Sequence, residues 1–184
     1  MMLTQLKQWL KKEQKDKTIF DIVLYGSSVK GKENPKDVDL LVIFREGSLK
    51  ERLEKIQHIK RKIKVNVPVD IKSVLWHELF AEEFFARRGI LTEGISIFDG
   101  KPFSLKLGFK GFTLFTYSLR AKNHTEKIKF NYVLRGRTTQ GMIKRLGGEH
   151  IAPGAILIPI GKSLEFEDVL KMHAIEYQIK NILM

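Results

Sequence analysis

Two aspartates, Asp37 and Asp39, open an apolar run that continues to Phe44. Residues separated by one position on a strand point to the same face of a sheet, so the two carboxylates are expected side by side. Like charges placed so closely are unfavourable unless a cation lies between them. Hard divalent cations such as Mg²⁺ prefer carboxylate oxygens and also bind substrate phosphates. The pair therefore predicts metal-dependent chemistry on a phosphate compound.

A second chemical signal comes just before this pair. The apolar run from Ile22 to Tyr25 ends in Gly26 and Ser27, and a short glycine-bearing segment follows. Such a turn offers free backbone N–H groups and a hydroxyl, and both suit a phosphate. A third carboxylate, Asp70, lies on the polar side of an alternating segment, residues 65–74.

The elements that must position these residues follow from hydrophobic periodicity and turn residues. We expect strands over residues 18–25, 38–44, 65–74, 95–98, 155–160 and 175–183. We expect helices over residues 3–15, 48–63, 76–88, 113–121, 125–135, 140–146 and 163–172. In the first half, strands alternate with helices, which favours an α/β (α+β) fold with a mixed sheet flanked by helices.

Taken together, Gly26-Ser27, Lys30-Gly31 and Asp37-Val38-Asp39 resemble the signature of the nucleotidyltransferases of the DNA polymerase β superfamily, particularly their minimal branch. The resemblance covers about residues 18–100. That family also uses a third acidic residue on a later strand, and Asp70 lies where that residue would be.

The resemblance implies roles for these positions. Asp37 and Asp39 would hold the ions of a two-metal Mg²⁺ site, and Asp70 would complete it on the acceptor side as ligand or base. Gly26 and Ser27 would bind the phosphates of a nucleoside triphosphate (NTP), and Lys30 would add positive charge.

Past residue 100 the composition changes. Residues 101–145 hold 11 Lys or Arg and one acidic residue, Glu126, with aromatic residues interleaved. We expect residues 1–105 to form the nucleotidyltransferase domain and residues 106–184 a smaller basic α+β domain. That concentration of charge favours an anionic partner, with nucleic acid the leading candidate and a solvated basic face the alternative. The residues expected to contact an acceptor or nucleic acid are Lys127, Lys129, Arg135, Arg137, Lys144 and Arg145.

The chain has 184 residues, a net charge of +12 and no cysteine. No apolar run approaches the roughly 18 residues that span a membrane, and the absence of cysteine favours a cytoplasmic location.

The leading functional interpretation is Mg²⁺-dependent transfer of a nucleoside monophosphate (NMP) from an NTP to an acceptor hydroxyl, with RNA as the expected acceptor and pyrophosphate released. Two alternatives stay open at this point. One is an antitoxin-type enzyme that transfers AMP to a protein partner. The other is a catalytically silent nucleic-acid-binding module on the same scaffold.

Overall fold

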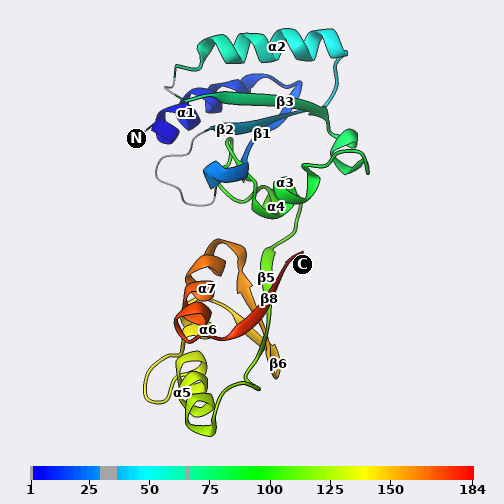
Figure 1. Cartoon of the computed structure of the whole chain (residues 1–184). Helices are drawn as coiled ribbons and strands as arrows, with labels where there is room; N and C mark the ends of the chain where they lie inside the picture. The colour runs from blue at the N-terminus through cyan, green and yellow to red at the C-terminus, as the bar shows by residue number, and fades with distance from the viewer. Residues whose placement is uncertain (1, 30–36, 65–66) are drawn as a thin grey trace. The chain divides into compact units, whose positions relative to one another are not determined.

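In the computed structural model, which describes residues 2–29, 37–64 and 67–184, the chain divides into two compact units (Figure 1). Unit 1 comprises Met1–Gly108 and unit 2 comprises Phe109–Met184. The assignment of separate roles to residues 1–105 and 106–184 stays a prediction. The elements of unit 1 are α1 (Met2–Lys11), η1 (Lys12–Lys15), β1 (Ile19–Tyr25), η2 (Gly26–Val29), β2 (Val38–Phe44), α2 (Leu49–Lys62), β3 (Val69–Leu75), η3 (His77–Phe80), α3 (Arg87–Glu93), β4 (Ile95–Ser96) and α4 (Phe103–Lys106).

Unit 1 is built on a four-stranded sheet in the order β3-β2-β1-β4. Strand β2 pairs with β1 in the antiparallel sense and with β3 in the parallel sense, so the sheet is mixed. Helix α2 covers one face of this sheet, and α3 and α4 lie on the other (Figure 1). The predicted mixed sheet flanked by helices is confirmed.

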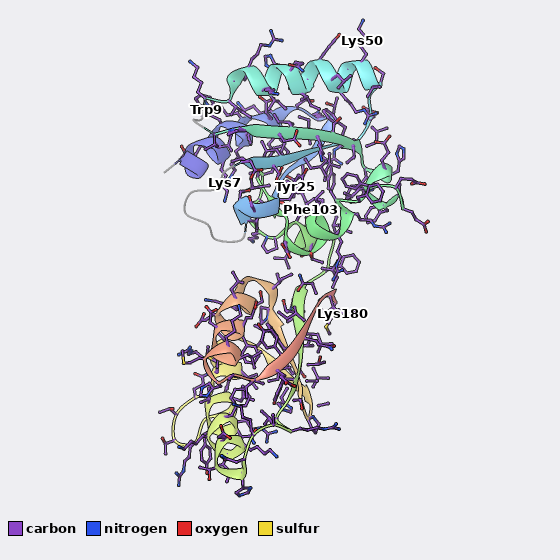
Figure 2. The ribbon with its side chains drawn as sticks, viewed as in Figure 1. Lys7, Trp9, Tyr25, Lys50, Phe103 and Lys180 are labelled. Carbon is purple, nitrogen blue, oxygen red and sulfur yellow. The ribbon has the colours of Figure 1, made fainter. Side chains whose placement is uncertain are left out.

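Alternation along the strands sends side chains to these two faces. Leu40 and Val42 of β2 pack in the core with Ile59 of α2. Leu41 and Ile43 pack on the opposite face, in the cluster that contains Tyr25 and Phe103, both labelled in Figure 2. Asp39 belongs to the second set by parity, so the carboxylates project from the face that carries α3 and α4.

Helix α2 begins as its sequence predicts. The Ser48 hydroxyl accepts a hydrogen bond from Glu51 N–H at 3.3 Å, and the Glu51 carboxylate accepts one from Ser48 N–H at 2.7 Å. The spacing of Leu49, Leu53, Ile56 and Ile59 predicts that all four lie on one buried side of the helix, and the structure confirms this for Ile56 and Ile59 but not for the two leucines. Leu49 and Leu53 are 62% and 49% exposed, and the buried residues are Arg52, Ile56 and Ile59.

The helix expected over residues 76–88 is wrong. A short 3-10 helix, η3, occupies its beginning, and α3 starts only at Arg87. The Glu78 carboxylate accepts a hydrogen bond from Leu75 N–H at 2.6 Å and pairs with Arg52 at 3.2 Å. These contacts hold Glu78 back against the end of β3, so tertiary interactions override the local helical pattern.

A buried ion pair joins β1 to α4. Asp21 is fully buried and accepts hydrogen bonds from Ser96 Oγ and Lys106 Nζ, each at 2.7 Å. Lys106 also pairs with Asp99 at 3.0 Å. Removing one partner of such a pair leaves an uncompensated charge in the interior.

We therefore expect Lys106→Met to lower the free energy of unfolding at pH 7 by about 3 kcal/mol. Urea denaturation followed by circular dichroism measures this change. Lys101→Met, at an exposed position nearby, is the matched control and should change stability by less than about 0.5 kcal/mol. Equal effects of the two substitutions would contradict the buried-pair account.

Unit 2 holds a second four-stranded sheet, in the order β6-β7-β5-β8, whose paired neighbours are all antiparallel. With its two main helices it follows a β-α-β-β-α-β path, the ferredoxin-like topology. Its elements are β5 (Gly111–Ser118), α5 (His124–Arg135), α6 (Met142–Arg145), β6 (Glu149–Ala152), β7 (Ala155–Pro159), η4 (Ile160–Lys162), α7 (Ser163–Met172) and β8 (Glu176–Leu183). The predicted α+β character of this part of the chain is confirmed.

In unit 2 one expected element is wrong and one strand was not predicted. Residues 113–121 were expected to be helical, but most of them lie in strand β5, whose Phe115 is fully buried in the core of the unit. Strand β6 was not predicted, since its residues are mostly exposed and give no apolar alternation. The N-cap of helix α5 is Asn123, which exchanges hydrogen bonds of 2.9 Å with Glu126.

Candidate active site

The Gly26-Ser27 turn follows β1 directly. Gly26 has a φ of 75°, a left-handed conformation that glycine adopts with little strain. A Cβ atom at this position would collide with Oδ2 of Asp39. The absence of a side chain at Gly26 thus allows the turn to lie directly against the carboxylate.

Asp37 and Asp39 lie beside this turn at the start of β2. Ser27 Oγ donates a hydrogen bond of 3.0 Å to Oδ1 of Asp37. Asp39 is the register partner of Tyr25 on β1. The turn and the pair of carboxylates, which the sequence predicts to act together, are in contact.

Asp70 is brought to the same place by the sheet. In the parallel pairing of β2 with β3, Asp39 and Asp70 are register partners. The Asp70 side chain is 59% exposed, and its Oδ2 lies 3.9 Å from Nζ of Lys72, which is 56% exposed. The third carboxylate therefore neighbours the first pair but stays open to solvent.

The electrostatics of this cluster favour a bound cation. Burial raises the pKa of the Asp39 carboxyl, the charges on Asp37 and Asp70 raise it further, and Lys72 offsets part of this effect. Burial, followed by the charges on Asp39 and Asp70, raises the pKa of Tyr25 to about 12. Beyond the effect of burial, the neighbouring carboxylates contribute to both pKa shifts, and a bound cation would offset their negative charge.

The sequence profile of the family described as nucleotidyltransferase domain matches residues 3–97. The chain belongs to this family. No curated protein matches the chain. The match confirms the predicted resemblance, and it begins earlier than the expected residue 18 because it includes α1.

The donor atoms of the nucleotidyltransferase domain suit Mg²⁺ in part. Among the described residues, no three His, Cys, Asp or Glu side chains are gathered closely enough to hold a metal ion by themselves. Mg²⁺ commonly binds through one or two carboxylates together with substrate phosphates and water. Asp37 and Asp39 fit that mode, with the phosphates of a nucleotide supplying further oxygens.

Tyr25 and Lys72 of the nucleotidyltransferase domain lie at the cluster although sequence reasoning did not select them. Lys72 follows Asp70 by two positions, so strand alternation alone places it on the same face. Tyr25 is the last residue of β1, directly before the Gly-Ser turn. The two-residue spacing from Asp70 could have pointed to Lys72, and the position before the Gly26-Ser27 turn could have pointed to Tyr25.

The other predicted site residues are Lys30 and six cations of unit 2. Lys30 lies outside the described residues. Lys129, Arg135, Arg137 and Lys144 are exposed side chains of unit 2, and Lys127 is half-buried. Arg145 pairs with Glu165 at 3.2 Å. No helix in the described part of the chain has the length and apolar content needed to cross a membrane.

The raised pKa of Asp39 has a consequence for stability. Since the folded chain holds the Asp39 proton more tightly than an unfolded chain does, the ionised carboxylate destabilises the fold at neutral pH. Without metal, we expect Asp39→Asn to raise the melting temperature at pH 7 by about 2 °C. The gain should disappear below about pH 3.9, where the carboxyl is protonated in both states.

Differential scanning calorimetry in EDTA across this pH range measures the effect. Asp70→Asn removes a charge from the same cluster at a more exposed position and should stabilise less. A melting temperature that falls at pH 7 in Asp39→Asn would contradict the account of crowded carboxylates.

Proposed function

We propose that the chain is an Mg²⁺-dependent nucleotidyltransferase that transfers an NMP from an NTP to an acceptor hydroxyl and releases pyrophosphate. The observation that carries the proposal is the contact of the Gly26 turn with Asp39, whose register partner is Asp70, in a chain of this family. A phosphate-binding turn, a pair of carboxylates and a third carboxylate are the parts that nucleotidyl transfer needs.

Each residue has a role in this proposal. The backbone of Gly26 and the hydroxyl of Ser27 hold the β- and γ-phosphates, with Lys30 adding positive charge. Asp37 and Asp39 hold Mg²⁺. Without a nucleotide the Ser27 hydroxyl donates its one hydrogen bond to Asp37, and with a nucleotide bound it donates to a phosphate oxygen instead. Bound Mg²⁺ supplies positive charge to the triphosphate and lowers the pKa of the attacking hydroxyl.

The reaction balances without a further reactant. The acceptor oxygen bonds to the α-phosphorus, the bond from that phosphorus to the β-bridging oxygen breaks, and pyrophosphate leaves with that oxygen. Asp70 serves on the acceptor side. As the base it receives the hydroxyl proton, and as a metal ligand it leaves that proton to solvent water.

A groove beside Asp70 supports a nucleic-acid acceptor. It has a volume of about 430 Å³ and runs between α2 and the edge strand β3. Lys60 and Lys72 line it together with Asp70, and Phe84 adds an aromatic wall. Two cations and a ring beside the acceptor-side carboxylate suit the phosphate and base of a terminal nucleotide.

To identify the acceptor, the full chain is incubated with Mg²⁺ and each α-labelled NTP in a cytoplasmic extract. The cytoplasm is the location expected from the sequence. The proposal expects the label in material that ribonuclease destroys and protease spares. Label in protein instead would support AMP transfer to a protein partner. Tight NTP binding with no labelled product from any extract would support the catalytically silent scaffold.

A further inference from the structure

The net positive charge of unit 2 comes from one part of its chain. Residues 120–145 contain eight Lys or Arg and one acidic residue. The rest of the unit, residues 109–119 and 146–184, contains four Lys or Arg and five acidic residues. The basic segment corresponds to α5, the loop after it and α6.

The loop between α5 and α6 draws these residues together. Gly136 has a φ of 83°, and a Cβ there would strike the backbone of Thr139 and Gly141. A Cβ on Gly141 would likewise strike the backbone of residues 134–136. The two ends of the loop are therefore in contact, which brings the beginning of α6 to the end of α5.

An exposed aromatic ring lies within this basic segment. Tyr132 of α5 is 44% exposed, and the Arg137 guanidinium lies over its ring, 5.2 Å from the ring centroid. Lys129 and Arg135 are three residues before and after Tyr132, so they flank it on the same side of the helix. We call Lys129, Tyr132, Arg135, Arg137 and Lys144 the basic surface.

The cations of the basic surface are available to a partner. Within the described residues, no carboxylate lies within 4.0 Å of Lys129, Arg135, Arg137 or Lys144. By contrast, Lys122 pairs with Glu126 at 3.7 Å, and Arg145 pairs with Glu165 at 3.2 Å. Helix α5 therefore presents uncompensated cations around a ring that is not buried in the core.

The sheet of unit 2 is a poorer candidate for the same partner. Its face away from the core carries Phe112, Leu114, Leu157 and Ile182, with Lys180 as a cation on the same face by alternation. Sheets that stack bases present several aromatic rings there. The helical side combines several cations with an exposed ring, and the face of the sheet does not.

We propose that the basic surface binds single-stranded nucleic acid. Lys129, Arg135, Arg137 and Lys144 contact successive phosphates, and an unpaired base stacks on the Tyr132–Arg137 pair. A duplex would not offer a free base face to this ring, which is why the strand is single. The inference rests on the proposed function only in taking this strand to be the acceptor.

The test is fluorescence anisotropy of the full chain with a labelled 12-residue oligouridylate and, as a separate arm, the matching oligothymidylate. Tyr132→Ala should weaken binding about tenfold, and Tyr132→Phe should bind like the wild type because it keeps the ring. Arg137→Gln and Lys129→Gln should each reduce the salt dependence by about 0.7 in the log–log slope. Lys180→Gln, which removes an exposed cation on the sheet, is the matched control and should leave both quantities unchanged.

Any one of three results would overturn the proposal. The first is that neither oligonucleotide binds with a salt-dependent affinity. The second is that Tyr132→Ala binds as tightly as Tyr132→Phe, and the third is that Lys180→Gln weakens binding as much as Arg137→Gln. Tighter binding in the RNA arm than in the DNA arm would identify RNA as the ligand within the proposed class.

The outcome is separable from the proposed reaction. Asp37→Asn with Asp39→Asn should leave oligonucleotide binding unchanged, and Tyr132→Ala should leave NTP binding unchanged. If the aspartate double variant loses oligonucleotide binding while Tyr132→Ala keeps NTP binding, the basic surface is rejected and the nucleotidyl-transfer proposal stands.

Discussion

Asp37→Asn combined with Asp39→Asn is expected to reduce NMP transfer by at least about 10³-fold while the chain stays folded. The carboxylates are the strongest candidates for holding Mg²⁺, and an amide offers a neutral oxygen in place of a charged one. The fold should not suffer, because the pKa of Asp39 is already raised by burial and by the charges around it. Labelled-product formation at saturating NTP measures the loss.

Asp168→Asn is the matched control for that double substitution. Asp168 is an exposed residue of α7 in unit 2, so its replacement should leave the rate within about twofold. Metal-dependent NTP binding should also fall in the double variant, as titration with Mn²⁺ would show. Unchanged metal and nucleotide binding would defeat the assignment of Asp37 and Asp39.

Gly26→Ala should have the second largest effect on the reaction. At a φ of 75° an alanine is strained, and its Cβ would meet Oδ2 of Asp39. Either the turn or the carboxylate must move, and a displacement of about 1 Å at a reacting site can cost about 10²-fold in rate. Stability should fall by only about 1–2 kcal/mol, so enough folded protein remains to assay.

Gly100→Ala separates backbone strain from contact with the site. Gly100 has a φ of 68°, and a Cβ there would have no described atom within 4 Å. Its substitution should cause a similar loss of stability but leave the rate unchanged. If both alanine variants lose activity equally, the close approach of Gly26 to Asp39 is not what matters.

The sequence was most informative for strands that bury apolar side chains on one face and carry carboxylates on the other. Alternation predicted Asp37 and Asp39 on one face of β2 and Asp70 on the polar side of β3, and in the structure Asp39 and Asp70 are register partners. Alternation does not state strand order or direction. The antiparallel pairing of β1 with β2, which brings Tyr25 opposite Asp39, needed the structure.

Sequence reasoning failed where tertiary contacts outweigh local pattern. Phe112, Phe115 and Leu119 have helical spacing, but Phe115 belongs to strand β5. This strand lies between β7 and β8, and the Phe115 side chain is buried in the core. The expected helix after Trp76 is interrupted because Glu78 is engaged with Leu75 and Arg52. The local sequence does not reveal the contact with Arg52, since Arg52 lies 26 residues away from Glu78.

The central claim is that this site transfers an NMP from an NTP, and a comparison of label positions tests it most directly. The full chain is incubated with Mg²⁺, its acceptor pool and ATP labelled at either the α- or the γ-phosphate, with the other NTPs examined in the same way. The account predicts that α-label enters the acceptor while γ-label appears only in pyrophosphate. Transfer of γ-label to the acceptor, or no release of pyrophosphate with any NTP, would contradict it.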